Sequence, residues 1–112
     1  MDGAVQPITL SVRTKRFSLS IIRLCGTLPH SAEARVLGKQ LLRSGTSVGA
    51  HYREATCSRS TAEFVSKMGG GLQELEENNY WLELLQESDI ASARQIAPLL
   101  KEAQELTAIL VT

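Results

Sequence analysis

The sequence predicts an all-α protein that folds as an antiparallel, up-down-up-down four-helix bundle. Four stretches of the 112-residue chain carry apolar residues at intervals of three and four, which is the period of an amphipathic helix. The segments between these stretches are short, and short connections place consecutive helices antiparallel. No segment has the alternating pattern of a convincing strand.

The N-terminal part of the chain predicts an irregular arm followed by a first helix. We expect the arm over residues 1–13, because Gly3 and Pro7 interrupt any sustained period, and the bundle over residues 14–112. The first helix is expected over residues 14–27 and ends before Pro29, which forces the preceding residue out of the helical region. Its apolar stripe consists of Phe17, Ile21, Leu24 and Leu28.

A second helix is expected over residues 32–57, with Ser31 as its N-terminal cap. Its core face consists of Leu37, Leu41, Ser44, Val48, Tyr52 and Ala55. A line of mostly small residues lies beside that face and consists of Gly38, Leu42, Gly45 and Gly49. Each glycine costs a helix about 1 kcal/mol relative to alanine. We therefore expect close packing along this line, and we interpret it as a surface for another copy of the chain.

A third helix is expected over residues 61–86, where Ser60 and Glu63 form a capping box. Its core face consists of Phe64, Met68, Gly71, Leu72, Leu75 and Leu82. Asn78 and Asn79 lie on or near that face, so their amides need hydrogen-bond partners.

A second apolar line on the third helix lies away from the core face and consists of Gly70, Trp81 and Leu84. An exposed tryptophan beside a leucine is costly to leave in water, so we expect a subunit contact to cover it. The candidate oligomer interface therefore comprises Gly38, Leu42, Gly45, Gly49, Gly70, Trp81 and Leu84.

The last helix is expected over residues 92–111, starting near Ser92. Its stripe consists of Ile96, Leu99, Leu100, Ala103, Leu106 and Leu110. Pro98 falls after the first turn, where it removes a hydrogen bond and is expected to kink or delay the helix.

Length, composition and charge fit one small domain. No run of roughly 18 apolar residues occurs, which predicts no membrane span, and residues 1–17 lack the apolar stretch of a secretory signal. Cys25 and Cys57 are compatible with free thiols, so we expect the cytoplasm. Residues 1–67 hold 10 Lys/Arg against 4 Asp/Glu, and residues 68–112 hold 2 against 8. This asymmetry reflects either basic and acidic helices lying side by side or a basic binding face.

Three blocks resemble the four-helix-bundle family of 23S rRNA intervening-sequence proteins: LLRSGTSVGAHYREA, SRSTAEFVSKM and LQELEENNYWLELL. The matching positions are Gln40, Leu41, Arg43, Ser47, Val48, Ala50, Glu54, Ser60, Phe64, Lys67, Glu74, Glu77, Trp81 and Leu82. The resemblance covers roughly residues 17–111 and implies a barrel-shaped homopentamer. The related accessory proteins of diversity-generating retroelements share the fold, and they bind nucleic acid and a reverse transcriptase through basic surfaces.

Two positions depart from the pattern of that family. His51 stands where the family usually has asparagine, and the run of Gly69, Gly70 and Gly71 stands where relatives usually have an apolar residue, alanine and leucine. The run predicts either a very close helix crossing or a local hinge. A phosphate-cradling loop would need a preceding strand and a lysine-serine or lysine-threonine ending, and the sequence has neither.

The search for reactive chemistry finds no catalytic residues, no cofactor site and no metal site. His51 and Cys57 face apart on a helix, and Cys25 and His30 form no ligand set of the usual spacing. The glutamates of the third helix lack the histidines that a carboxylate-bridged metal bundle requires. We therefore do not expect an enzyme.

Arg43 admits two interpretations. It either forms an ion pair with Glu74 or Glu77 that fixes the register of two helices, or it contacts phosphate. The candidate nucleic-acid-binding set for the second interpretation is Arg35, Lys39, Arg43 and Arg53. Three function classes follow: an oligomeric scaffold or adaptor, an accessory protein that binds RNA or DNA, and an unrecognised enzyme, of which we favour the first.

Overall fold

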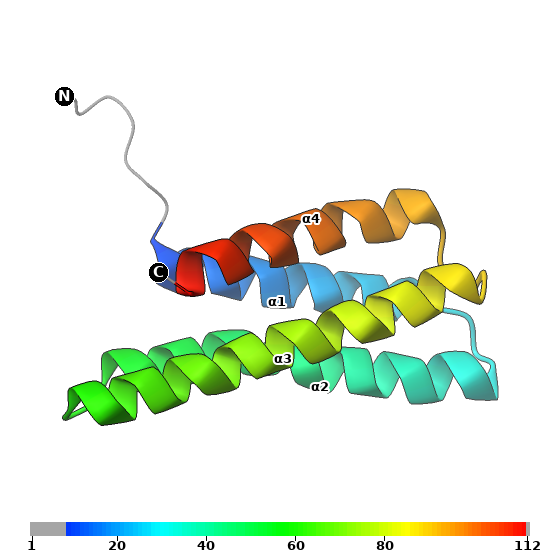
Figure 1. The fold of residues 1–112 in the computed structure, drawn as a ribbon. Helices are drawn as coiled ribbons and strands as arrows, with labels where there is room; N and C mark the ends of the chain where they lie inside the picture. The colour runs from blue at the N-terminus through cyan, green and yellow to red at the C-terminus, as the bar shows by residue number, and fades with distance from the viewer. Residues whose placement is uncertain (1–8, 112) are drawn as a thin grey trace, which may run out of the picture.

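The structure is a computed structural model that describes residues 9–111. It contains four α-helices and no strand within those residues: α1 (Leu10–Thr27), α2 (Ala32–Thr56), α3 (Thr61–Glu87) and α4 (Ala93–Leu110), as Figure 1 shows. The predicted all-α fold class is confirmed. None of the four helices is long and apolar enough to cross a membrane.

The helices pack as an antiparallel bundle. The α2–α3 hairpin has the most extensive packing, α1 packs on α2, α4 packs on α3, and α1 and α4 close the bundle. The backbones of α1 and α3, and those of α2 and α4, do not approach each other, so the members of each pair occupy opposite corners. This arrangement is the predicted up-down-up-down topology.

Helix α1 begins earlier than expected. The residues expected as an irregular arm partly lie outside the described part of the chain, but residues 10–13 are helical. Thr9 caps this helix, because its Oγ1 accepts the Val12 N–H at 3.2 Å. Thr14 explains the difference: it fills a core position with 1% exposure and donates its hydroxyl to the Leu10 carbonyl at 2.8 Å. Because Thr14 is polar, the apolar period did not extend to residues 10–13, and the sequence did not predict the first turn of α1.

Serine caps set the starts of the other three helices. Ser31, Ser60 and Ser92 each accept the backbone N–H of the residue three positions later. The capping box expected at Ser60 is only half formed, because the Glu63 carboxylate accepts from the Arg59 N–H at 3.3 Å. Helix α4 has a complete box, in which Gln95 accepts the Ser92 N–H at 3.0 Å.

The turn that connects α3 to α4 contains a residue in the left-handed conformation, and α4 then starts without the expected delay. Asp89 has a φ of 62°, the left-handed conformation that commonly ends a helix, and the Ile90 N–H reaches back to the Leu85 carbonyl at 3.0 Å. Helix α4 then begins at Ala93 and continues through Pro98. The expected delay is wrong, because the capping box starts the helix and both Pro98 and Arg94, whose carbonyl loses its partner, are exposed.

The glycine line of α2 faces α1 of the same chain. A Cβ at Gly45 would lie 2.8 Å from Ile21, one at Gly38 would lie 3.1 Å from Leu28, and one at Gly49 would lie 3.6 Å from Thr14. The missing side chains also let Ser18 donate its hydroxyl to the Gly45 carbonyl at 3.0 Å. Assigning Gly38, Gly45 and Gly49 to an oligomer interface is therefore corrected, since α1 occupies that line.

The core contains one buried amide. Asn78 is fully buried, and its Nδ2 donates to the Leu41 carbonyl at 3.1 Å and to Ser44 Oγ at 3.0 Å. Ser44 in turn donates to the Gln40 carbonyl at 2.9 Å. These bonds tie α3 to α2 and satisfy the NH2 group of Asn78. The expected partners are only partly found, because Oδ1 of Asn78 and Oδ1 of Asn79 are buried and accept no hydrogen bond from the described residues. The remaining core is apolar and includes Phe17, Ile21, Leu41, Leu75, Leu82, Ile96 and Leu106.

Candidate functional site

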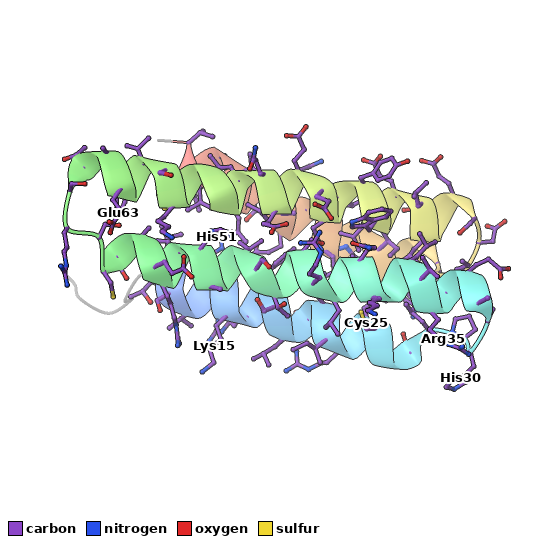
Figure 2. The ribbon with its side chains drawn as sticks, turned by 90° about the horizontal axis from the view of Figure 1, so that it is seen from below. Lys15, Cys25, His30, Arg35, His51 and Glu63 are labelled. Carbon is purple, nitrogen blue, oxygen red and sulfur yellow. The ribbon has the colours of Figure 1, made fainter. Side chains whose placement is uncertain are left out.

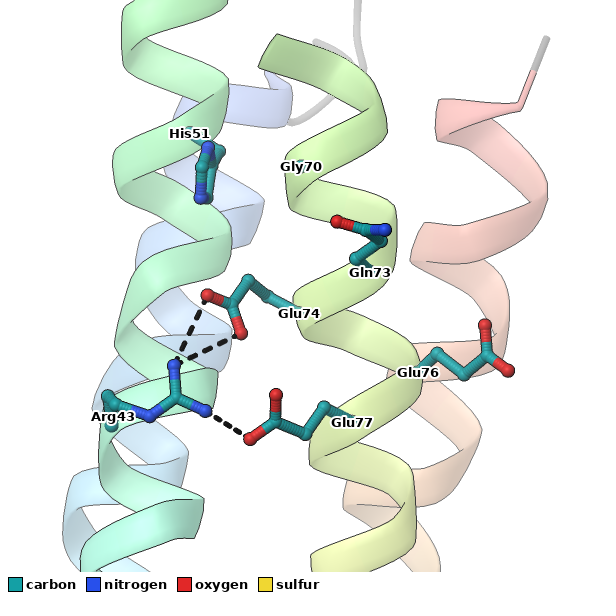
Figure 3. Close-up of a pocket in the computed structure, with 7 residues that line it drawn as sticks. All are labelled: Arg43, His51, Gly70, Gln73, Glu74, Glu76 and Glu77. Carbon is teal, nitrogen blue, oxygen red and sulfur yellow. Dashed lines mark hydrogen bonds and ion pairs between the residues drawn. The ribbon is translucent and has the colours of Figure 1, made fainter. Parts of the chain in front are cut away.

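An ion cluster joins α2 to α3 along one face of the hairpin (Figure 3). Arg43 of α2 pairs with Glu74 at 3.4 Å and with Glu77, both on α3. Glu76, on the same helix, points away from the arginine (Figure 3). The interpretation of Arg43 as a structural ion pair is thus confirmed.

Trp81 completes this cluster. Its indole N–H donates to Glu77 Oε2 at 3.0 Å, so one carboxylate accepts from an aromatic ring and from a guanidinium. The indole N–H is the larger cause and Arg43 the second, and together they lower the pKa of Glu77. The hydrogen bond that Arg43 donates to Glu77 in turn raises the pKa of Arg43. These contacts satisfy the polar end of a half-buried tryptophan and fix the register of α2 against α3.

Removing Arg43 is expected to destabilise the protein in a pH-dependent way. Arg43→Ala should lower the free energy of unfolding by about 1 kcal/mol at pH 7, since the pair is half exposed. A carboxyl whose folded pKa is lowered stabilises the fold above its unfolded pKa of about 4.3, and this contribution disappears as the pH falls through the lower folded value. The difference in melting temperature between variant and wild type should therefore be smaller at pH 3 than at pH 7.

The matched control for this experiment is Arg35→Ala, which removes an exposed arginine of α2 that touches only the His30 carbonyl, at 3.3 Å. It should leave the melting temperature almost unchanged at both pH values. An Arg43→Ala deficit of equal size at pH 7 and pH 3 would contradict the assignment of the effect to the Glu77 carboxylate.

A close helix crossing lies beside the ion cluster. His51 of α2 lies against the glycine run of α3, which stays helical throughout (Figure 3). A Cβ at Gly70 would lie 2.8 Å from both Cε1 and Nδ1 of the imidazole, and a Cβ at Gly71 would lie 3.5 Å from the His51 Cβ. The prediction of a close crossing is confirmed, and the hinge is not. The two departures from the family pattern therefore touch each other: the glycine supplies the space that the larger histidine fills.

This compensation predicts energetic coupling between His51 and Gly70. Gly70→Ala in the wild type should gain about 1 kcal/mol of helix propensity and lose a similar amount by displacing the imidazole. In a His51→Asn background the displacement is absent, so the same substitution should stabilise the protein by about 1 kcal/mol. Urea denaturation of the four proteins in this double-mutant cycle measures the coupling.

Gly69→Ala is the control for this cycle, because no atom lies within 4 Å of a Cβ built there. It should stabilise both backgrounds equally. Additive effects of Gly70→Ala and His51→Asn would show that the two residues are independent.

The structure divides the predicted nucleic-acid-binding set. Two separate hollows lie along the seam between α1 and α2, and we call the two together the α1–α2 groove. Arg35 and Lys39 line one hollow, and Arg53 lines the other together with Lys15 of α1. Figure 2 shows Lys15 and Arg35 near opposite ends of this helix pair. Arg43 lines a different pocket, toward α3. Among the described residues, no acidic side chain lines the α1–α2 groove.

The other residues expected at an oligomer interface differ in how exposed they are. Leu42 is exposed on α2, whereas Trp81 and Leu84 are only half-buried on α3. Gly70 faces His51 of the same chain, as described above, and is removed from the expected interface for that reason.

Sequence reasoning missed the ion pairs of Arg13 and of Lys67. Arg13 of α1 pairs with Glu102 at 2.8 Å and with Glu105 at 2.6 Å on α4, and these hydrogen bonds raise its pKa. Arg13 lies in the segment expected as an irregular arm, and the sequence therefore predicted no ion-pair partner for it. Lys67 pairs with Glu54 at 3.0 Å near the tip of the α2–α3 hairpin and lowers the pKa of that carboxyl. Lys67 and Glu54 both occupy positions that match the family pattern, and this match was the available signal for their pairing.

The cysteines and histidines do not form a ligand cluster. Within residues 9–111, no three residues of the metal-ligating types come together. The half-buried Cys25 donates its thiol to the Gly38 carbonyl at 3.5 Å, and burial raises its pKa, so it remains a thiol. Cys57 is free and exposed at the end of α2.

Fold and contacts define a small four-helix-bundle protein whose polar clusters hold helices in register. The sequence matches the 23S rRNA-intervening sequence protein family over residues 9–112, and the chain belongs to that family. It is also similar to a crystal structure of a protein of unknown function from the S23 ribosomal protein family of Bacteroides thetaiotaomicron VPI-5482. That similarity has a TM-score of 0.87 and 33% identity, covering 92% of this chain and 95% of the other. No curated protein matches the sequence.

Proposed function

We propose that the protein is a non-enzymatic scaffold or adaptor that assembles from several copies of itself, with a homopentamer as the expected assembly, in the cytoplasm. The observation that carries this proposal is the number of large apolar side chains exposed on the outside of the bundle. Those that are at least 37% exposed are Val12, Leu19, Ile22, Val36, Leu42, Phe64, Val65, Tyr80, Ile109 and Val111. Four of them, Phe64, Val65, Ile109 and Val111, line one hollow between α3 and the end of α4, and apolar side chains gathered in this way are typical of an interaction surface.

The sequence resemblance supports the assembly number, since a barrel-shaped homopentamer is what it implies. The cytoplasmic location is supported by the two free cysteines, one of them exposed. The non-enzymatic role is supported by the use of the polar side chains: Glu74 and Glu77 are occupied by Arg43 and Trp81, and Asn78 is occupied in the core.

Light scattering coupled to size-exclusion chromatography tests this proposal. We expect a mass close to five times that of one chain over a wide concentration range, with dissociation only on strong dilution. The mass of a single chain at every concentration would contradict the proposal.

A second candidate function is binding of RNA or DNA, and the α1–α2 groove favours it. Lys15, Arg35, Lys39 and Arg53 line that groove, and half of the acidic residues of the chain lie on α3. Arg43 does not belong to this surface, because it is paired with glutamates.

Filter binding of RNA and DNA over a salt series tests the second function. Three phosphate contacts would give a slope of log affinity against log salt of about −2 to −3. Combined replacement of Arg35, Lys39 and Arg53 by alanine should abolish retention without changing the melting temperature, whereas Arg43→Ala should lower the melting temperature and keep retention. A slope of zero would exclude electrostatic nucleic-acid binding.

A further inference from the structure

The outer face of α1 carries positive charge and exposed apolar side chains. Basic and apolar residues alternate along this face, which we call the α1 stripe: Val12, Lys15, Arg16, Leu19, Ile22 and Arg23. Leu19 is 39% exposed and Ile22 is 46% exposed. Helix α1 contains no acidic residue. Arg16 and Arg23 make no ion pair within the described part of the chain, so their charges are available to a partner.

The outer face of α3 carries the opposite charge. Its exposed residues at intervals of three and four form the α3 stripe: Gln73, Glu76, Tyr80, Glu83 and Glu87. Tyr80 is 55% exposed and lies between two glutamates, with the half-buried Trp81 and Leu84 beside it. Glu76 and Glu83 form no salt bridge with any residue that the structure describes. This face combines an aromatic centre with unpaired negative charge.

The two stripes match in spacing. Arg16 and Arg23 are seven residues apart, as are Glu76 and Glu83, which corresponds to about 10 Å along a helix. Leu19 lies between the first pair and Tyr80 between the second. Helices α1 and α3 run in the same direction. When two copies lie parallel, Arg16 and Arg23 of one copy therefore face Glu76 and Glu83 of the other, and Leu19 faces Tyr80.

The position of the stripes favours a second copy of the chain as the occupant. Helices α1 and α3 occupy opposite corners of the bundle, and the residues of both stripes are exposed, so each copy presents both complementary faces outward. A contact between different faces of identical chains repeats from copy to copy and closes into a ring when the rotation allows. A contact of either stripe with itself would place like charges together.

We propose that copies of this chain associate head to tail, with the α1 stripe of one copy against the α3 stripe of the next. This inference rests on the proposed self-assembly and assigns the surfaces that perform it. Arg16 pairs with Glu76 and Arg23 with Glu83 across the contact, and Tyr80 covers Leu19. Salt weakens the contact, since its charges lie at the rim of an apolar centre.

Charge reversal tests the pairing. One variant carries Arg16→Glu and Arg23→Glu, a second carries Glu76→Arg and Glu83→Arg, and a third carries all four substitutions. Each two-residue variant faces like charge at every contact and should associate about 100-fold more weakly than wild type. The four-residue variant has the reversed pairing on both faces and should recover the mass of the wild-type assembly.

The matched control reverses two basic residues outside both stripes, Arg94→Glu and Lys101→Glu, which are exposed on α4. It changes the net charge as much as the α1 variant does and should keep the assembly intact. Helix content from circular dichroism confirms that each variant is folded, because all substituted side chains are exposed.

The outcomes separate this inference from the proposed function. Dissociation of both two-residue variants and recovery in the four-residue variant support the pairing. An assembly that survives the two-residue reversals, or that the four-residue variant fails to restore, overturns the pairing while self-assembly stands. A wild-type chain that is monomeric at every concentration overturns both.

Discussion

Replacing Asn78 by aspartate is expected to lower the free energy of unfolding by about 4 kcal/mol at pH 7, because it buries an uncompensated charge. The amide nitrogen donates two hydrogen bonds, to the Leu41 carbonyl and to Ser44 Oγ. A carboxylate cannot donate either one, and it would place negative charge against the carbonyl oxygen. Asn78 has no solvent exposure through which water could compensate.

The effect of Asn78→Asp should shrink as the pH falls. Burial raises the pKa of the introduced carboxyl above the unfolded value of about 3.9, so the part of the penalty that comes from its charge is absent below that value and grows as the pH rises toward the folded pKa. The loss of one donated hydrogen bond remains at every pH, because a neutral carboxyl has a single O–H. Wild type behaves in the opposite sense, because its lowered glutamate pKa values, such as that of Glu77, stabilise the fold at higher pH. Urea denaturation at pH 7 and pH 4 measures both trends.

Gln73→Glu is the matched control, since Gln73 is exposed on the same helix. It should cost clearly less at pH 7 than the change at Asn78. A variant Asn78→Asp with wild-type stability at pH 7 would show that the buried amide does not hold α3 to α2.

Gly45→Ala is expected to destabilise the protein by about 2 kcal/mol, although alanine favours a helix by about 1 kcal/mol. A Cβ at Gly45 would lie 2.8 Å from two carbons of Ile21 and 3.1 Å from Asn78 Nδ2. Ile21 is fully buried, so its displacement would force neighbouring core side chains to shift. The change would also stretch the hydrogen bond from Ser18 to the Gly45 carbonyl. Chemical denaturation followed by circular dichroism measures the loss.

Gly26→Ala provides the contrast, because Gly26 lies in α1 with no atom within 4 Å of its built Cβ. It should stabilise the protein by up to about 1 kcal/mol. A gain in stability from Gly45→Ala would show that α1 and α2 can separate slightly without cost.

Local signals predicted the helices well. Apolar spacing identified all four, and serine side chains marked where α2, α3 and α4 begin, because a hydroxyl before a helix satisfies backbone N–H groups whatever the tertiary structure. The start of α1 was missed because Thr14, a polar residue, fills a core position and returns its hydrogen bond to the Leu10 carbonyl. The period of apolar residues alone cannot reveal a buried hydroxyl that donates to a carbonyl of its own helix.

The partners of residues were harder to predict than their helices. Glycine spacing indicated close packing along α2, but which neighbour approaches depends on the handedness of the bundle, and α1 rather than another chain lies there. Arg43 was correctly linked to Glu74 and Glu77, since the α2–α3 hairpin brings those positions together. The basic residues of α2 were grouped by charge, whereas the structure separates Arg43 from the groove that the others line.

The placement of α1 and α3 at opposite corners of the bundle separates positive charge from negative charge. Helix α1 has four basic residues and no acid, whereas α3 has six glutamates and one lysine, so a chain of zero net charge has a large dipole moment across its width. Such molecules orient one another before they touch, and dissolved ions suppress that orientation. The protein should therefore be least soluble in dilute buffer near neutrality, and added salt should dissolve it.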